Sequence, residues 1–335
     1  MEDIITMDHG SGGESSGALI EKIFLPAFED PALDALGDGA VLPFETGAKL
    51  VCSTDSFVIA PRFFPGGDIG KLSVCGTVND VCMAGGEPLY LTLGMILEEG
   101  LALEELRRIT ASIADTAKRA HVRIVTGDTK VVERGRGDGI YINTAGVGVL
   151  RHEGLSRARI REGDAVIVSG TLGDHGAAIM LSRQELGFCS SLSSDCAPLH
   201  EICRALYPLG DALRVLRDPT RGGAATALCE FVDSTPLCIE LEEAAIPLRE
   251  DTAEACAILG LDPLYCANEG KLLAIAAPEA AETALRAMQN APYGKNAAII
   301  GRVSARSPGR TILHTRAGGT RILTKLTGSP LPRIC

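Results

Sequence analysis

The sequence lacks an excess of basic residues and lacks any long apolar run. It contains 43 Asp and Glu residues against 32 Lys and Arg residues, a formal net charge of −11. Non-specific attachment to nucleic acid or to an anionic membrane needs positive charge, so this balance argues against both partners. No apolar run approaches the roughly 20 residues that a membrane-spanning helix needs, and the start, Met1-Glu2-Asp3, is acidic where a signal peptide is basic. We therefore expect a cytoplasmic protein without a nucleic acid or membrane partner.

The 11 cysteines contain no C-x-x-C pair, and their number is odd. Ten of them stand in apolar surroundings, as Cys52 does after Leu50-Val51 and Cys82 does after Val81. This pattern is typical of reduced core thiols and not of disulfides or structural zinc. The eleventh, Cys335, is the last residue, where a small apolar side chain has no packing reason to be.

Two familiar nucleotide-binding motifs are also missing. Gly70-Lys71 comes nearest to a Walker A loop, but Pro65 stands where the first glycine belongs and Leu72 where Ser or Thr belongs. No G-x-G-x-x-G sequence follows a predicted strand. Neither motif therefore accounts for a nucleotide site in this chain.

Length and pattern predict two domains that each combine helices with strands. At roughly 100–200 residues per domain, 335 residues make about two. Apolar spacing predicts helices over 103–120, 174–186 and 220–231, and strands over 122–126 and 165–168 and near 237–241 and 271–275. The unpatterned stretch 150–163 separates the two blocks. We expect an N-terminal arm and helix over 1–36, a first domain over 37–150, a second over 151–323 and a tail over 324–335.

The tail carries Gly328, Pro330 and Pro332, which oppose a helix and favour extended backbone. An extended chain reaches on the order of 3.3 Å per residue, so this segment is long enough to enter a cleft well away from its anchor. Cys335 is either an inert terminal residue or a thiol that a mobile arm carries between sites. Its position at the end of a proline-rich arm favours the second interpretation.

A glycine-rich segment precedes the first helical pattern. It consists of His9, Gly10, Ser11, Gly12 and Gly13. Glycines let backbone amides approach an anion closely, and the start of a helix adds a favourable field. A flexible N-terminus explains the five residues equally well.

Acidic residues recur in turn-like contexts beside Gly, Ser, Thr or Asn. They are Asp38, Asp55, Asp80, Asp128 and Asp218. Each alone is better explained as a turn former or helix cap. Together they offer the hard oxygen ligands that Mg²⁺ on nucleotide phosphates requires. Asp80 stands out, because its neighbours predict an otherwise apolar helix.

Two further polar clusters adjoin predicted strands, at Asp128-Thr129-Lys130 and at Asn268-Glu269-Gly270-Lys271. A lysine near phosphate neutralises developing charge, and a half-buried glutamate can act as a general base. A surface loop is the simpler explanation of both. His175 is a weaker catalytic candidate, and a histidine at the start of a helix explains it better.

These segments together resemble the HypE family of hydrogenase maturation proteins, within the aminoimidazole ribonucleotide synthetase (PurM-like) superfamily. The resemblance extends over nearly the whole chain. Its motifs are His9–Gly13, Ser53–Ser56, Phe63–Leu72, Gly76–Asp80, Gly127–Val132, Asp218–Gly223, Ala267–Lys271 and the ending Pro332-Arg333-Ile334-Cys335. The ending separates this family from its relatives.

The resemblance implies an α+β, two-domain PurM-like architecture with a mobile C-terminal tail. It also implies a homodimer formed through the sheet of the first domain, with ATP in a cleft shared with the glycine-rich arm. The implied reaction is ATP-dependent dehydration of an S-carboxamide on the terminal cysteine to a thiocyanate. The carbamoyl group comes from the carbamoyltransferase HypF, and the cyanide passes to iron held by the HypC–HypD complex for the [NiFe]-hydrogenase centre.

By match to the motifs, the resemblance also implies residue roles. Cys335 bears the substrate, Glu269 is the base and Lys130 its electrostatic partner. The implied ATP contacts are His9, Gly10, Ser11, Gly12, Gly13, Asp55, Lys71, Asn79, Asp80 and Asp128. The implied Mg²⁺ ligands are Asp38, Asp55, Asp80, Asp128 and Asp218.

Three alternatives stay open at this point. A selenophosphate synthetase would carry a reactive Cys near the glycine-rich segment, whereas the first cysteine here is Cys52. A thiamine monophosphate kinase would have no use for a terminal thiol. A non-catalytic carrier would use Cys335 for delivery and would not need the aspartates.

Overall fold

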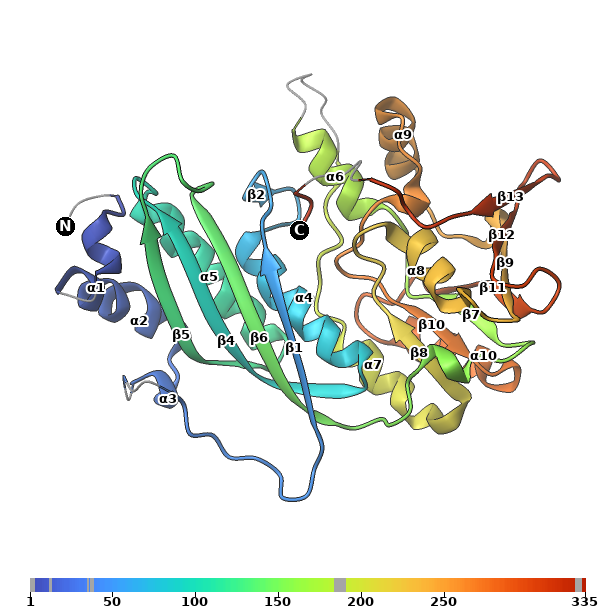
Figure 1. Ribbon diagram of the computed structural model, residues 1–335, viewed down its shortest axis with the longest axis horizontal. Helices are drawn as coiled ribbons and strands as arrows, with labels where there is room; N and C mark the ends of the chain where they lie inside the picture. The colour runs from blue at the N-terminus through green and yellow to red at the C-terminus, as the bar shows by residue number, and fades with distance from the viewer. Residues whose placement is uncertain (1–3, 12–13, 35, 37–38, 184–190, 329–332) are drawn as a thin grey trace.

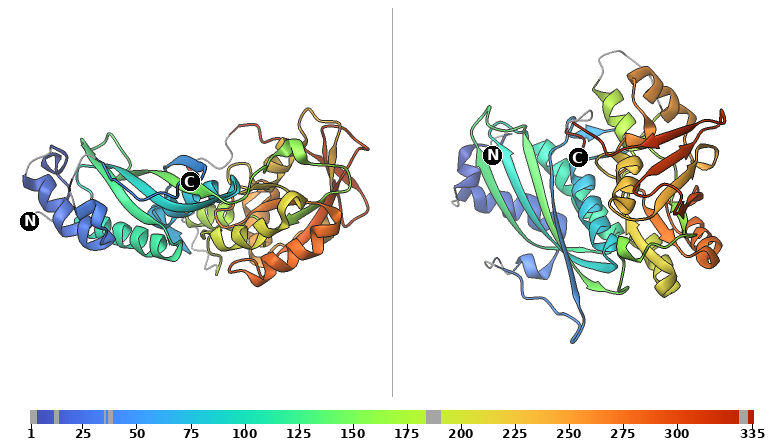
Figure 2. Two further views of the ribbon diagram at one scale, coloured as in Figure 1. Left: turned by 90° about the horizontal axis from the view of Figure 1, so that it is seen from below. Right: turned by 45° about the vertical axis from the view of Figure 1, so that its right-hand side comes forward.

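The computed structural model describes residues 4–11, 14–34, 36, 39–183, 191–328 and 333–335. Two sheets with their own helices lie side by side, and the C-terminus lies between them (Figure 1). Figure 2 shows the same arrangement from two further directions.

The first half is built on a four-stranded sheet in the order β1-β6-β4-β5. Its strands are β1 (Leu50–Phe57), β4 (Gly86–Glu98), β5 (Arg123–Val132) and β6 (Ile140–Leu150). Strands β4 and β5 are parallel, and the other neighbours are antiparallel. Burial alternates along the strands, so the sheet has one packed face and one open face.

Helices α4 (Ile69–Met83) and α5 (Leu103–Arg119) cover the packed face (Figure 1). Helix α5 buries an apolar stripe that includes Leu106, Ile109 and Ile113. Helix α4 is buried on almost every side, because it lies between this sheet and the second half of the chain. Asp68 caps its start, where a carboxylate oxygen accepts hydrogen bonds from the amides of Gly70 and Lys71.

Short helices of the N-terminal arm pack beside β5, and a small hairpin precedes α4. The arm comprises η1 (Met7–Gly10), α1 (Glu14–Leu19), η2 (Ile20–Phe24), α2 (Leu25–Phe28) and α3 (Pro31–Asp34), and the hairpin comprises β2 (Phe63–Phe64) and β3 (Gly67–Asp68).

The second half is built on a seven-stranded sheet in the order β13-β12-β9-β11-β7-β10-β8. Its strands are β7 (Ala165–Val168), β8 (Leu213–Arg217), β9 (Cys238–Glu242), β10 (Leu273–Ala276), β11 (Ala298–Ser304), β12 (Thr311–His314) and β13 (Thr320–Leu323). Its helices are α6 (Asp174–Ser182), α7 (His200–Leu206), α8 (Gly223–Val232), α9 (Glu250–Leu259) and α10 (Ala281–Asn290).

The central strands β7 and β10 are buried at every position, because both faces of the sheet are packed. Ile167 and Ala274 join one apolar cluster, whereas Val166 and Ile275 join another on the opposite face. The first cluster continues through α7 into α4, so the two halves share a core.

Most of the predicted elements are confirmed. The strand at 165–168 is β7, the helix at 103–120 is α5, and Asp80 lies on the apolar helix α4. The helix predicted from 220 begins at Gly223, because Gly222 has a φ of 80° and ends the preceding turn. The helix predicted over 174–186 is α6, which ends at Ser182, and residues 184–186 lie outside the described part of the chain.

The prediction for the cysteines is wrong at one position. Eight of the ten cysteines in the described part of the chain are buried, but Cys52 is exposed. Side chains alternate between the two faces of a strand, and Val51 points into the core, so its neighbour Cys52 points to the open face of β1. Apolar neighbours in the sequence therefore did not place Cys52 in the core.

The structure places the end of the tail, Arg333–Cys335, against the segment that follows β1. Residues 329–332 lie outside the described part, and the mobility of the tail stays a prediction. Within the described residues, no helix is long and apolar enough to cross a membrane.

Candidate active site

A cleft of about 480 Å³ lies between the two halves of the chain. Four carboxylates from four separate segments line it or border it: Asp55 on β1, Asp80 on α4, Asp218 after β8 and Glu269 before β10. Cys335 lines the same cleft, although it lies 66 residues beyond Glu269 in the chain. The fold therefore gathers four of the predicted acidic residues around the terminal thiol.

Close packing between β1 and α4 determines where the carboxylates of Asp55 and Asp80 lie. A Cβ atom on Gly76 would lie 2.9 Å from the ring of Phe57, so only glycine lets the helix approach the strand here. Asp80 follows Gly76 by four residues and lies on the same helix face. The Ser53 hydroxyl donates a hydrogen bond of 2.8 Å to the Asp80 carboxylate, which joins the helix to the strand.

Asn268 connects the other two carboxylate-bearing segments. Its side-chain oxygen accepts a 2.7 Å hydrogen bond from the Gly173 amide, and its side-chain nitrogen donates to the Pro219 carbonyl at 3.1 Å. The Glu269 amide donates to Asp195 at 3.1 Å, and Lys271 forms a buried ion pair with the same aspartate at 3.1 Å. Glu269 is thus held on both sides along the backbone.

Burial raises the pKa of every carboxyl group in the cleft. It raises the pKa of Asp218 to about 7, with a further contribution from the charge of Asp80. The pKa values of Asp55 and Asp80 are raised by burial and held down partly by Arg221. The pKa of Glu269 is raised well above its ordinary value, by burial first and then by nearby negative charges. The cleft therefore favours a bound cation.

The donor set suits Mg²⁺. Carboxylates are the hard oxygen ligands that this ion uses when it bridges to phosphates. One carboxylate oxygen of Glu269 is buried without a hydrogen-bond partner, and Glu269 is only 3% exposed. Among the residues that the structure describes, three or more metal-ligating side chains do not converge closely enough to form a complete metal site. Phosphate oxygens and water would have to complete the coordination of any ion held here.

The terminal thiol faces Glu269 from the tail. The Val58 amide donates a 3.1 Å hydrogen bond to the terminal carboxylate of Cys335, in continuation of β1. Burial first, and then the negative charge of Glu269, raises the pKa of the Cys335 thiol to about 12. The thiol is therefore protonated at neutral pH while it is in the cleft.

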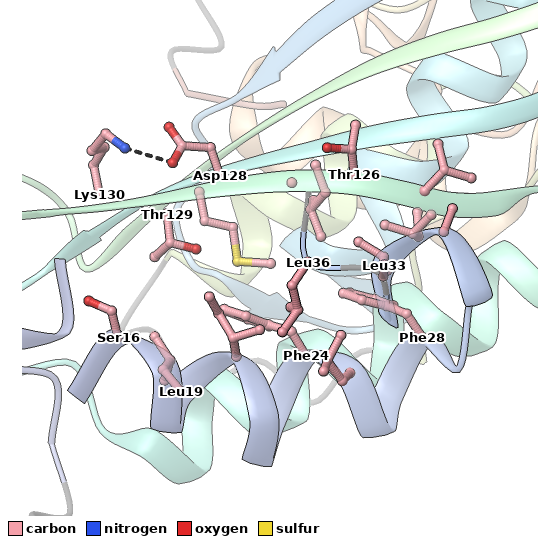
Figure 3. Close-up of a pocket in the computed structure, with 18 of the residues that line it drawn as sticks. Ser16, Leu19, Phe24, Phe28, Leu33, Leu36, Thr126, Asp128, Thr129 and Lys130 are labelled. Atoms are coloured by element: carbon pink, nitrogen blue, oxygen red, sulfur yellow. Dashed lines mark hydrogen bonds and ion pairs between the residues drawn. The ribbon is translucent and has the colours of Figure 1, made fainter. Parts of the chain in front are cut away.

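A second pocket, of about 330 Å³, lies between the N-terminal arm and β5. Figure 3 shows an apolar floor with Leu19, Phe24 and Phe28 beneath the polar side chains of Asp128 and Lys130. Lys130 pairs with Asp128 at 2.6 Å, and this bond lowers the pKa of the Asp128 carboxyl. His9 and Gly10 line the pocket as well.

The predicted residues thus fall into two groups that lie apart in this chain. The cleft holds Asp55, Asp80, Asp218, Glu269 and Cys335, and the arm pocket holds His9, Gly10, Asp128 and Lys130. Ser11 lies beside the second group in the arm, and Asp38, Gly12 and Gly13 lie outside the described residues.

Two predicted ATP contacts lie elsewhere. The Lys71 ammonium group donates to the Gly66 carbonyl at 2.8 Å and lines a third pocket. The Asn79 side chain is 2% exposed, donates to the Ala197 carbonyl and accepts from the Leu199 amide. Asn79 therefore holds the backbone of residues 197–199 in place, and its direct contact with ATP stays a prediction.

Sequence reasoning missed Arg221 and Asp195. Arg221 lines the cleft and stands three residues after Asp218, within the Asp218–Gly223 motif. Its closeness in sequence to Asp218 could therefore have identified it as a residue of the cleft. Asp195 lies in a segment without regular structure, 74 residues before Glu269, and the sequence carries no sign of that contact.

Family models and relatives match almost the whole chain. The model for the AIR synthase related protein N-terminal domain matches residues 36–150, and the model for the C-terminal domain matches residues 161–314. The fold and the cleft therefore define an AIR synthase related protein, and the predicted α+β PurM-like class is confirmed.

Closer relatives specify the family. The carbamoyl dehydratase HypE of Cupriavidus necator is 48% identical over 332 residues, which are 99% of this chain and 95% of that protein. The crystal structure of HypE in complex with ATP has a TM-score of 0.93 at 46% identity and covers 98% of this chain and 99% of that one. The structure of a HypE–HypF complex has a TM-score of 0.80 at 46% identity, with 92% and 100% covered. The chain belongs to the HypE family.

Proposed function

We propose that this chain is an ATP-dependent carbamoyl dehydratase that acts on its own terminal cysteine. The observation that carries the proposal is the position of Cys335 in one cleft with the buried Glu269 and three further carboxylates. The name of the Cupriavidus relative and the ATP complex of the solved HypE support the same conclusion.

The reaction converts an S-carboxamide on Cys335 into a thiocyanate. The amide oxygen is a poor leaving group, so it first takes the γ-phosphoryl group of ATP. The nitrogen then gives up its second proton, the carbon–oxygen bond breaks, and phosphate leaves. Removal of the elements of water is thus coupled to the conversion of ATP into ADP and phosphate.

Glu269 is placed to accept protons from the carboxamide nitrogen. Its raised pKa makes its ionised form a strong base, and its buried oxygen has no hydrogen-bond partner among the described residues to compete for the proton. The hydrogen bond from its amide to Asp195 fixes the backbone beneath this side chain.

Asp55, Asp80 and Asp218 would hold Mg²⁺ with the phosphates of ATP. When bound there, Mg²⁺ neutralises charge on the phosphoryl group during transfer. The three carboxylates lose their mutual repulsion at the same time, because a cation takes the place of the protons that their raised pKa values favour.

The high pKa of Cys335 bears on how the carbamoyl group arrives. A protonated thiol is a weak nucleophile, so the docked tail is unsuited to accept a carbamoyl group. We propose that the tail receives this group from HypF outside the cleft and then docks. The thiocyanate would leave by the same movement for iron held by the HypC–HypD complex.

Lys130 needs a second copy of the chain to reach Glu269. The strand register pairs Ser56 with Asn143, Asn143 with Gly94 and Gly94 with Asp128. At about 4.8 Å per strand, β5 therefore lies about 14 Å across the sheet from β1. We propose that two copies pack their open sheet faces together as a homodimer, so that Lys130 of one copy faces the cleft of the other.

Features of the open sheet face agree with this packing. Leu50 is 57% exposed and Ile96 is 44% exposed, and both stand on that face. Exposed apolar side chains of this size favour burial against a partner surface.

A mixing experiment tests the shared site. Lys130→Ala and Cys335→Ala copies are each expected to be inactive alone. After subunit exchange at equal amounts, half of the dimers are mixed and one of their two sites is intact, which gives about a quarter of the wild-type activity. Activity that stays at zero in the mixture would place Lys130 and Cys335 in the same copy. Full activity of Lys130→Ala alone would place Lys130 outside the reaction.

Glu269→Gln tests the base directly. We expect ATP to bind normally, while formation of thiocyanate on the carbamoylated tail falls by about 10²–10⁴-fold. Glu240→Gln is the matched control, because Glu240 is 5% exposed but pairs with Ser304 in the second sheet, away from the cleft. Equal loss in both variants would show a general effect of removing a buried carboxylate and would contradict the assigned role.

A further inference from the structure

Three consecutive carbonyl groups at the end of the tail are held by hydrogen bonds. The Arg333 carbonyl accepts from the Arg183 guanidinium at 2.5 Å and lies 3.4 Å from the Ala60 amide. The Ile334 carbonyl is 2.8 Å from Nε2 of His175, and Cys335 accepts from the Val58 amide at 3.1 Å. The backbone of the tail is therefore bound on two sides, by the segment after β1 and by α6 with the residue that follows it.

His175 can bond the tail in only one ring form. A carbonyl accepts hydrogen bonds, so Nε2 must carry the proton. Nδ1 then accepts from the Ser194 hydroxyl at 2.7 Å, and the Ser194 oxygen in turn accepts from the Cys196 amide at 3.1 Å. Phe64 packs edge-on to the imidazole, with ring centroids 5.6 Å apart. The imidazole is fully buried and fully bonded in this form, so its orientation toward the tail is fixed.

Arg183, the residue after α6, connects the tail to the first half of the chain. Nε of Arg183 donates to the Ala60 carbonyl at 2.6 Å while the other end of the guanidinium donates to Arg333. The Ile334 side chain is 3% exposed and belongs to the core cluster that both halves share. Arg333 itself pairs with Asp138 at 2.6 Å. Tail docking and the contact between the halves are thus parts of one packed arrangement.

We propose that His175, with Arg183 beside it, is the positioning residue that sets the terminal sulfur against Glu269. The hydrogen bonds described above join both side chains to the backbone carbonyls of residues 333 and 334 and not to the sulfur. They therefore hold the tail in the same way whether the sulfur carries hydrogen, a carboxamide or a cyano group. The consequence for catalysis rests on the proposed dehydratase function, but the docking contact does not.

Thiol labelling measures docking without the reaction. N-ethylmaleimide labels the protein in the absence of ATP for a fixed time, Lys-C releases the peptide 326–335, and mass spectrometry measures the ratio of labelled to unlabelled Cys335. His175→Phe keeps a planar aromatic ring, although a larger one, and removes the donor, and His175→Gln keeps a donor. His152→Phe is the matched control, because His152 is a buried histidine stacked on Tyr207 away from the tail.

We expect the ratio of labelled to unlabelled Cys335 to rise about tenfold in His175→Phe, because the Ile334 carbonyl loses its donor. The ratio should rise less in His175→Gln and stay unchanged in His152→Phe. Arg183→Met gives a second test at a half-exposed position if His175→Phe does not fold, and the ratio should rise there as well. A ratio equal to wild type in every folded His175 or Arg183 variant would overturn the proposal.

Turnover separates positioning from a purely structural role. In His175→Phe carrying a carbamoylated tail, kcat should fall while the KM for ATP stays at the wild-type value, and His175→Gln should recover part of kcat. If wild-type protein shows no dehydration at all, the proposed function fails while the labelling result still decides the docking contact. An unchanged kcat in a variant with tenfold faster labelling would show that the contact does not position the reacting sulfur.

Discussion

Replacement of Asp218 by asparagine tests the electrostatics of the cleft. In the metal-free protein, burial raises the pKa of this carboxyl group from 3.8 to about 7. Folding therefore favours its protonated form, and the free energy of unfolding falls as pH rises from about 4 to about 7. The asparagine side chain would keep the size of the protonated carboxyl group and would not titrate.

The magnitude follows from the size of the shift. A rise of about three pKa units costs about 4 kcal/mol when the group is fully ionised, and about 2 kcal/mol of this cost is present near pH 5.5. The stability advantage of Asp218→Asn over wild type should thus widen by about 2 kcal/mol between pH 5.5 and pH 8. In a domain of this size that corresponds to a gap in thermal midpoint that grows by about 4–8 °C.

Thermal unfolding in EDTA, followed by circular dichroism at both pH values, measures the gap. Asp211→Asn is the control, because the Asp211 side chain is 95% exposed on the same half of the chain. A gap that is constant with pH, or a variant less stable than wild type at pH 8, would refute the assigned burial cost. Added Mg²⁺ and ATP should then stabilise wild type and not Asp218→Asn.

Three further changes test separate parts of the structure. Asp80→Asn should abolish ATP-dependent phosphate release with carbamoylated protein, because it removes a charge that would hold Mg²⁺; a pure carrier would be unaffected. Ile334→Ala should free the tail, because it removes a buried side chain worth about 2–5 kcal/mol, and faster labelling of Cys335 would report this. Gly10→Ala should loosen the arm, because the added Cβ would lie 2.8 Å from the Val131 amide, and limited proteolysis of the arm would detect it.

Local patterns predicted the parts of the site that depend on one element. Asp80 stands in an apolar helix, and the sequence alone predicted that solvent would not explain it; α4 indeed directs it toward β1. The motif around Glu269 adjoins a strand, and the structure places it in the cleft. In both cases the spacing within one helix or strand fixes which way the side chain points.

Long-range arrangement was beyond the sequence patterns. Asn79 is adjacent to Asp80, yet its side-chain amide bonds a segment more than a hundred residues away. The neighbouring sequence does not distinguish an asparagine that holds another segment in place from one that contacts ATP. Lys130 and Glu269 were paired by resemblance, but in one chain the width of the sheet separates them. Cys52 shows the same limit, because apolar neighbours on an edge strand do not say which face is buried.

The central claim is that the tail itself is the substrate. The most direct test is the mass of the C-terminal peptide from carbamoylated protein, before and after incubation with Mg²⁺ and ATP, beside a Cys335→Ala control. We expect this peptide to lose the mass of one water molecule only when ATP is present. Hydrolysis of ATP without any change in the peptide mass would contradict the claim and would favour phosphoryl transfer to a small molecule.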